Sequence, residues 1–189
     1  WLSFQIVTAE ELFYEILMRQ RAERAKFAAA LETAKAQSEP LAKSPTAEQI
    51  GAVARKHQLV ARQAWQTANR LEATLEEMTL NDLGGQQARD LLKTKVIDGI
   101  RQLHSEPMAR LREALDAAAA DPGAEQLAAA RERHDEVVAA MQKILDQMSQ
   151  WENFIDVLNQ LKEIVKLQND VLQSTEQEKK KRTSDLFDE

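Results

Sequence analysis

A sustained alternation of three- and four-residue steps between apolar positions constrains this chain more than any other feature of its sequence. The repeat runs from Leu127 to Leu172, which is about six heptads. Its seam positions are Leu127, Ala130, His134, Val137, Met141, Ile144, Met148, Trp151, Ile155, Leu158, Lys162, Val165, Asn169 and Leu172. A repeat of this period and length is typical of a long α-helix that packs along other helices. We therefore expect one helix from about residue 122 to about residue 180.

Capping signals mark where two further helices begin. Both TAEE (8–11) and TAEQ (46–49) fit the capping box, in which the first and fourth side chains each accept a hydrogen bond from the other residue's backbone N–H. These boxes predict helices over residues 8–37 and 46–79. The segment SEPLAKSP (38–45), with its two prolines, is expected to separate them.

A third helix is expected over residues 86–120, after the turn segment LNDLGG (80–85). It should bend at HSEP (104–107), where Ser105 can cap a new turn and Pro107 fits only the first turn of a helix. Asp121 and Pro122 then predict an N-cap followed by the first helical residue of the fourth helix.

The composition agrees with a helical fold. Ala, Leu, Glu, Gln, Lys and Arg dominate, and the 189 residues include only five Gly and four Pro. Short connections place consecutive helices antiparallel. We expect an all-α fold, namely an elongated antiparallel helical bundle or coiled coil of about four long helices, preceded by a short N-terminal strand.

The first seven residues, WLSFQIV, alternate like a β-strand, and the pattern does not return. Because a lone strand is not stable, we expect residues 1–7 to be the end of a β-domain that lies upstream in a larger protein. The expected organisation is therefore this strand, a helical bundle over residues 8–182 and a C-terminal tail over residues 183–189.

The fourth helix should be about 20 residues longer than its neighbours, and this excess is not polar. Such an apolar stripe has to be buried. A second copy of the chain, a partner helix or the upstream domain can cover it, or the chain can fold back near Trp151. We favour contact between molecules, with five predicted contact residues: Trp151, Ile155, Leu158, Val165 and Leu172.

No pattern in the sequence supports a catalytic, cofactor-binding or metal-binding site. The chain has no Cys and no glycine-rich phosphate loop, and the Glu-x-x-His motif of bundle metal sites is absent at all three histidines. His57 and His134 lie on helix seams and can meet across helices, but we interpret them as polar seam residues that set helix register. We therefore expect no enzyme activity, no cofactor, no metal and no small-molecule substrate.

Charge and hydropathy argue against two further classes of partner. The net charge of −6 disfavours nucleic acid, because phosphate binding needs a positive stripe. The one basic run, EKKKR (178–182), is interpreted as cations that offset the dipole at a helix C-terminus. No uncharged run is long enough to span a bilayer, so membrane attachment is expected only through upstream regions.

Three stretches resemble a known group of proteins. They are FQIVTAEELFYEILMRQRAERAKF (4–27), LHSEPMARLREAL (103–115) and WENFIDVLNQLKEIVKLQNDVLQSTEQEKKKRTSDLFDE (151–189). Together they are similar to the C-terminal helical region of large, uncharacterised bacterial envelope proteins, in which immunoglobulin-like β-domains precede a long coiled coil. The resemblance implies a periplasmic or cell-envelope location within a membrane-anchored protein. It carries over no activity and no functional residues.

The helical pattern and the resemblance together favour a structural role. We expect a non-catalytic coiled-coil spacer or association domain that acts as a scaffold through self-association or protein–protein interaction of the fourth helix. Two alternatives stay open. A docking module for one specific partner protein would be a monomer in isolation, and an enzyme or metal-binding bundle would need a concave polar site.

Overall fold

The computed structural model describes residues 8–43 and 45–185, with side chains described as far as residue 180. This part of the chain is helical and contains no strand, so the expected all-α class is confirmed. It divides into two compact units, one ending at Glu152 and the other beginning at Asn153. The strand predicted over residues 1–7 and the end of the predicted tail, residues 186–189, lie outside the described residues.

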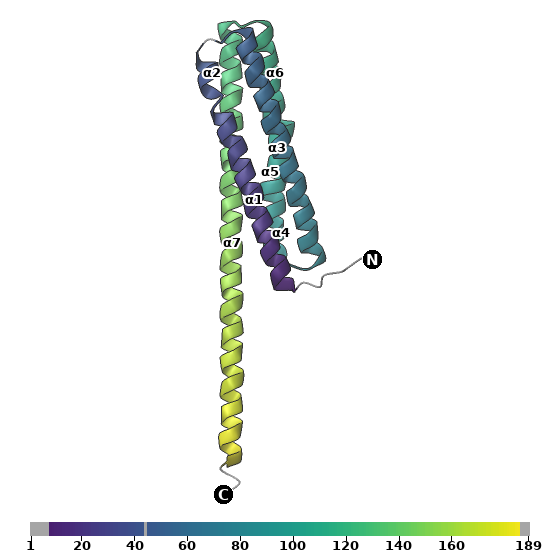
Figure 1. Ribbon diagram of the computed structural model, residues 1–189, viewed down its shortest axis with the longest axis vertical. Helices are drawn as coiled ribbons and strands as arrows, with labels where there is room; N and C mark the ends of the chain where they lie inside the picture. Colours follow the sequence, from purple (N-terminus) through teal and green to yellow (C-terminus); the bar gives the residue numbers. More distant parts are fainter. Residues whose placement is uncertain (1–7, 44, 186–189) are drawn as a thin grey trace, which may run out of the picture. The chain divides into compact units, whose positions relative to one another are not determined.

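Within residues 8–43 and 45–185, eight helical segments follow one another (Figure 1). They are α1 (Ala9–Lys35), α2 (Ser38–Ala42), α3 (Ala47–Leu80), α4 (Gly85–Leu91), the π-helix η1 (Leu92–Ile97), α5 (Asp98–Ser105), α6 (Pro107–Ala120) and α7 (Ala124–Asp185). The segment SEPLA, predicted as part of a break, forms the short helix α2.

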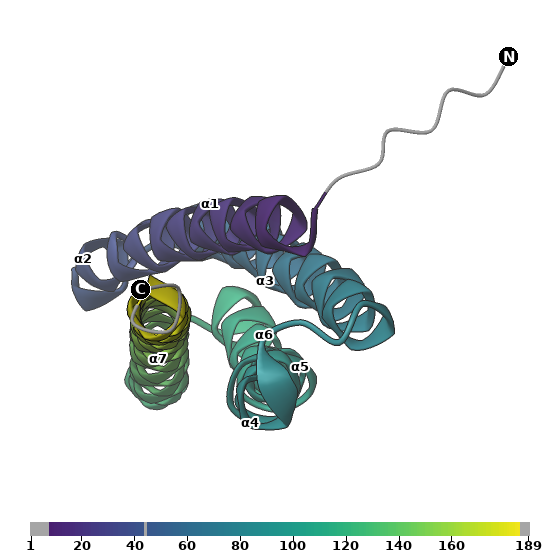
Figure 2. The same ribbon diagram turned by 90° about the horizontal axis from the view of Figure 1, so that it is seen from below.

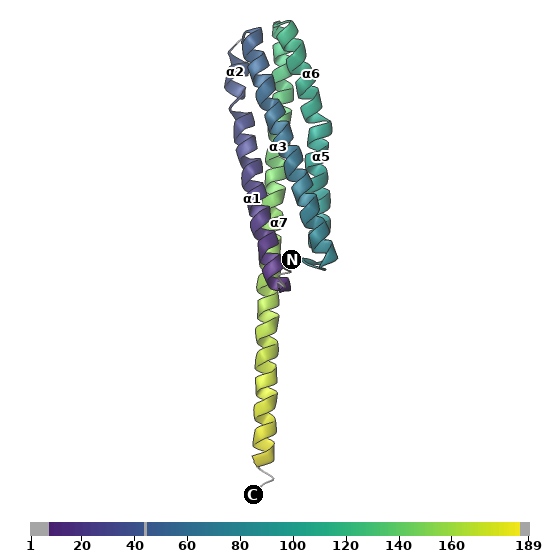
Figure 3. The ribbon, with the colours of Figure 1, turned by 45° about the vertical axis from the view of Figure 1, so that its right-hand side comes forward.

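The first unit is an antiparallel four-helix bundle built from α1, α3, the run α4–η1–α5–α6, and the part of α7 up to Glu152. Figure 2 looks along these helices, and Figure 3 shows the first unit from the side. Helix α3 packs against α1 on one side and against α5 and α6 on the other. Short connections between antiparallel neighbours explain this up-down order, as the sequence indicates.

Both predicted capping boxes are present. Thr8 Oγ1 accepts the Glu11 N–H at 3.1 Å, and the Thr8 N–H donates to Glu11 Oε2 at 2.8 Å. This backbone donor lowers the pKa of the Glu11 carboxyl, because it favours the charged form. Thr46 and Gln49 form the same reciprocal pair at the start of α3.

The run α4–η1–α5–α6, which forms the third long helix of the bundle, is bent and locally widened. Pro107 lies in the first turn of α6, as predicted, but Ser105 does not cap that turn, since its hydroxyl donates to the Gln102 carbonyl at 3.2 Å. Within η1 the backbone is wound as a π-helix, and the Asp98 N–H donates to the Lys93 carbonyl five residues earlier. Thr94 Oγ1 also donates to the Asp90 carbonyl at 2.8 Å.

The predicted start of the fourth helix is wrong by two residues. Asp121 is the C-cap of α6, with extended backbone, and α7 begins at Ala124 rather than at Pro122. The Gly123 N–H bonds to the Asp121 carbonyl at 2.7 Å. This tight turn reverses the chain and accounts for the two extra residues outside the helix.

Polar side chains on α1 join it to two neighbouring helices. The buried carboxylate of Glu23 accepts from Arg70 Nη1 of α3 at 3.1 Å. On the other side, Arg24 Nε lies 3.0 Å from Glu152 Oε1, and Arg24 Nη1 donates to Ser149 Oγ at 3.2 Å. The carboxylates of both pairs are buried but the arginine side chains are 54 % and 40 % exposed, so we assign these contacts to helix register rather than to net stability.

Candidate functional site

The seam of α7 is buried throughout the first unit. Leu127, Ala130, His134, Val137, Met141, Ile144, Met148 and Trp151 all lie in the core. Trp151 is 2 % exposed, and its Nε1–H donates to the Ala88 carbonyl of α4 at 2.8 Å. Helix α7 continues through this residue without a break in its helical backbone.

In the second unit the side chains of residues 161–180 are all exposed. Seven large apolar side chains there and just before, each 50–66 % exposed, follow one side of the helix. They are Val157, Leu161, Ile164, Val165, Leu167, Val171 and Leu172, which we call the 157–172 face. At about 100° per residue, these seven positions fall within one half of the helix circumference, so they form one side of the α-helix.

The five predicted contact residues divide between two environments. Trp151 and Ile155 are buried, at 2 % and 0 % exposure. Leu158 is half-buried, whereas Val165 and Leu172 are exposed and belong to the 157–172 face. A contact with another molecule can therefore use Val165 and Leu172 directly, while Trp151 already has a structural role in the bundle.

The 157–172 face is wider than the seam of a two-stranded coiled coil. When Leu161 is placed at heptad position a, Val157 and Ile164 fall at d, and Val165 and Leu172 fall at e. Apolar residues at a, d and e are typical of a helix that packs into a bundle, whereas a two-stranded seam needs only a and d. The face thus suits contact with more than one helix.

The edges of this face differ in charge. Asp156, Glu163 and Asp170 recur every seven residues and therefore lie along one edge of the helix. Lys162 lies on the opposite edge. Parallel copies arranged around a common axis would place the acidic edge of one copy toward the Lys162 edge of the next. Antiparallel pairing would instead bring two acidic edges together.

Two histidines meet inside the first unit, as the seam positions suggested. The rings of His57 on α3 and His134 on α7 are edge to face, with centroids 5.1 Å apart and an interplanar angle of 83°. The His134 Nε2–H donates to the Ala34 carbonyl at 3.0 Å, since a carbonyl can only accept. His134 Nδ1 lies 3.3 Å from Asp135 Oδ1.

His57 has no such support. Its side chain is 8 % exposed, and its buried Nε2 has no hydrogen-bond partner among the described residues. Burial, with a smaller contribution from His134, lowers the pKa of His57 to about 4, so the ring is neutral at pH 7. Within the described part of the chain, no group of three or more His, Cys, Asp or Glu residues lies close enough together to hold a metal.

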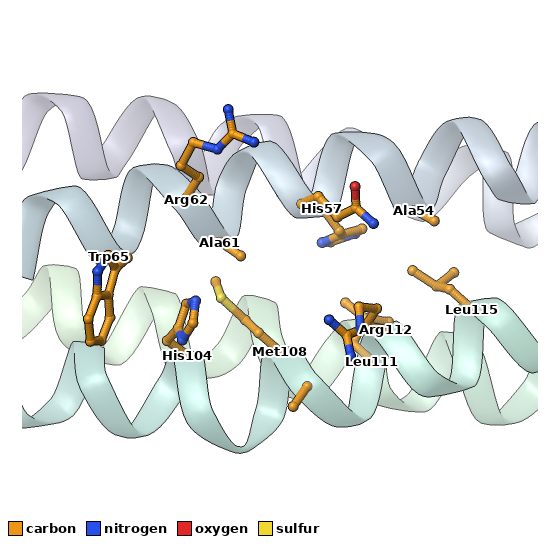
Figure 4. Close-up of a pocket in the computed structure, with 12 residues that line it drawn as sticks. Ala54, His57, Ala61, Arg62, Trp65, His104, Met108, Leu111, Arg112 and Leu115 are labelled. Atoms are coloured by element: carbon orange, nitrogen blue, oxygen red, sulfur yellow. The ribbon is translucent and has the colours of Figure 1, made fainter.

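A groove of about 380 Å³ runs beside His57, between α3 and the α5–α6 segment (Figure 4). Its apolar lining comes from Ala54, Ala61, Met108, Ala109, Leu111 and Leu115. At one end, the Trp65 ring of α3 lies against the His104 ring of α5, with centroids 5.1 Å apart. Arg62, Arg112 and Gln58 complete the lining, which includes no carboxylate.

Comparison of this chain with protein-family models, with curated proteins and with solved structures finds no match. Among the helices that the structure describes, none has both the length and the apolar character needed to cross a bilayer.

Proposed function

We propose that this chain is a non-catalytic association module that assembles with further copies of itself through the 157–172 face. The observation that carries the proposal is the exposure of seven large apolar side chains along one side of a single helix. Large contiguous apolar surfaces on soluble proteins mark interaction sites, because leaving them in water is unfavourable.

Two properties favour a second copy over an unrelated partner. The face has the a, d and e pattern that packs against helices of the same kind. Its acidic edge, with Glu163 at the centre, and its Lys162 edge are complementary when copies lie parallel. The resemblance of the sequence to envelope proteins would place this module in the cell envelope, as a spacer that holds copies together.

The deciding experiment measures solution mass by light scattering coupled to size exclusion, over a series of concentrations. We expect a mass of two or more chains for the wild type. Val165→Asp should give the mass of one chain, because a charge would then be buried in the interface. Helical circular dichroism of the first unit should be retained in that variant.

Lys166→Asp is the matched control, because it places the same side chain on the polar side of the same turn. This variant should assemble like the wild type. A wild type that remains a monomer at every concentration would overturn self-association and leave docking to a different protein as the explanation of the face. Equal effects of Val165→Asp and Lys166→Asp would show that charge, not the apolar face, controls assembly.

A further inference from the structure

We propose that copies of this chain meet at the 157–172 face in parallel and in the same register, as a bundle of three or four chains, and that their Gln168 side chains align them. The inference rests on the proposed function, because it states how the copies that share this face are arranged. Three features of the second unit carry it: a hollow lined by Gln168, the self-complementary amide of that residue, and the β-branched residues at heptad position d.

The hollow lies within the 157–172 face. It has a volume of about 310 Å³ and is lined by Ile164, Leu167, Gln168 and Val171. These residues are spaced i, i+3, i+4 and i+7, so they form the kind of four-residue hole that receives one side chain of a facing helix. Equal residues of parallel copies in the same register lie at equal heights along the axis. The side chain that such a copy presents to the hollow is therefore its own Gln168.

The Gln168 amide favours a second copy over an unrelated apolar helix. With Leu161 at heptad position a, Gln168 occupies the next position a, and its side chain is exposed. A glutamine amide both donates and accepts hydrogen bonds, so amides from parallel copies can satisfy one another when the interface excludes water. An apolar partner would leave the same amide buried without a hydrogen bond, which is costly.

Thr175, at the following position a, needs no such partner. Its Oγ1 donates to the Val171 carbonyl of its own helix at 2.8 Å, so the hydroxyl is already satisfied. Gln168 therefore gains more from a second copy than Thr175 does. A buried polar residue at one position a fixes the register of a coiled coil in this way.

The residues at position d determine how many copies fit together. Val157, Ile164 and Val171 occupy this position, and all three are β-branched. Parallel two-stranded coiled coils favour Leu at d, whereas Leu at a with Ile at d shifts the preference to three or four chains. Leu161 and Ile164 have the second arrangement. The apolar residues at position e widen the face further, so a bundle of three or four chains buries it best.

The charges along the edges of the face favour parallel copies. In a parallel bundle the acidic edge of one copy, with Glu163 at its centre, lies toward the Lys162 edge of the next. Antiparallel neighbours would bring acidic edges together. An antiparallel pair centred on Gln168 would nevertheless also place two amides side by side, so direction and register each need a measurement of their own.

Disulfide formation between introduced cysteines measures the direction, because the full chain has no Cys of its own. Val157→Cys should oxidise to a disulfide between copies, since equal residues are neighbours in a parallel bundle. In an antiparallel pair centred on Gln168, residue 157 would lie opposite residue 179, and the two copies of residue 157 would be about 33 Å apart. Lys166→Cys, on the polar side of the helix, is the matched control and should not crosslink.

Oxidation of a mixture of two variants measures the register, with peptide mass spectrometry to identify the disulfides. Val157→Cys mixed with Ile164→Cys should give no mixed disulfide, because the two levels differ by about 10 Å along the axis. Adding Gln168→Leu to both proteins should tighten association about tenfold and allow the mixed disulfide, because registers one heptad apart become similar in energy. Gln168→Asn should keep the single register. Thr175→Val is the matched control and should also keep it.

Solution mass separates failure of this inference from failure of the proposed function. We expect three or four chains for the wild type. A monomer at every concentration would overturn self-association and this inference with it, whereas a dimer would overturn this inference alone. So would a disulfide between Val157→Cys and Lys179→Cys in place of Val157→Cys pairs. A Gln168→Leu protein that still gives no mixed disulfide would refute the aligning role of Gln168, and Gln168→Ala replaces that variant if it is insoluble.

Discussion

Acid should destabilise the first unit through His57 before most of its carboxylates are protonated. The ring is buried between α3, α6 and α7, with the His134 ring centroid 5.1 Å away and the Arg112 side chain lining the same groove. Burial, and to a lesser extent His134, lowers the pKa of His57 from 6.5 to about 4. The unfolded chain therefore binds a proton at a pH at which the folded bundle does not.

The sign and size of the effect follow from this difference in pKa. A depressed histidine pKa contributes stability above pH 6.5 that is lost as the pH falls toward about 4. The full loss is about 3 kcal/mol, of which about 2 kcal/mol is expected by pH 5. For a unit of this size, about 2 kcal/mol corresponds to a decrease of about 4–8 °C in the unfolding midpoint.

The assay is chemical denaturation followed by circular dichroism, at about pH 7.5 and at about pH 5. His57→Leu has similar side-chain volume and cannot be protonated, so it removes this contribution and also the unpaired Nε2. Between these two pH values the wild type should lose about 2 kcal/mol more stability than His57→Leu. Parallel losses in the two proteins would refute the reasoning, because the ring would then titrate alike in both states.

Three further substitutions test the bundle itself. Gly84→Ala should lower the free energy of unfolding by about 1–2 kcal/mol, because Gly84 has φ of +74° and a new Cβ would lie 2.6 Å from the buried Met78 Cε. Gly85→Ala is the matched control in denaturant unfolding. It has φ of +71° but no atom within 4 Å of the new Cβ, so it should cost less. Trp151→Phe should cost about 2–3 kcal/mol in the same assay, because the Ala88 carbonyl loses its donor and a cavity opens; an unchanged midpoint would contradict the assigned bond. Thr46→Ala should cost about 1 kcal/mol by loss of the cap on α3, with Thr46→Ser expected to retain most of that stability.

The heptad seam and the capping boxes were enough to predict four antiparallel helices, because both signals are local and repeat often. The seam does not, however, locate the exposed face of the second unit. At about 100° per residue, the face centred on Leu161 and Ile164 lies more than about 100° around the helix from the buried Trp151 and Ile155. This is much more than the drift of about 20° per heptad that separates a regular α-helix from a repeat of 3.5, so the exposed face is a second apolar stripe and not a continuation of the seam.

The groove could not be predicted from the sequence. Trp65 and His104 are 39 positions apart, and each alone resembles an ordinary surface residue; their contact depends on how α3 and α5 are rotated about their axes. The meeting of His57 with His134 was foreseeable because both lie on seams. The His134 Nε2–H has a hydrogen-bond acceptor, the Ala34 carbonyl, whereas His57 Nε2 has none among the described residues. No sequence pattern indicates this difference.

The π-helix η1 also had no sequence signal, although its effect on the core is clear. Ala88, Leu92, Val96 and Ile100 are all buried and recur every four residues. In a regular α-helix this spacing would turn the apolar side gradually away from the core. A π turn holds more residues than an α turn, so it keeps these four side chains in phase with the bundle.

This local widening has a consequence for how the chain can change in length. In an ordinary bundle helix, deleting one residue rotates everything beyond it by about 100° and exposes the core positions that follow. Within residues 92–97 the same deletion would convert the π turn into an α turn, and α5 and α6 would keep their orientation. The π-helix therefore makes the α4–η1–α5–α6 run tolerant of a single-residue deletion at one place. Evolutionary variation in the length of this run would be least harmful there.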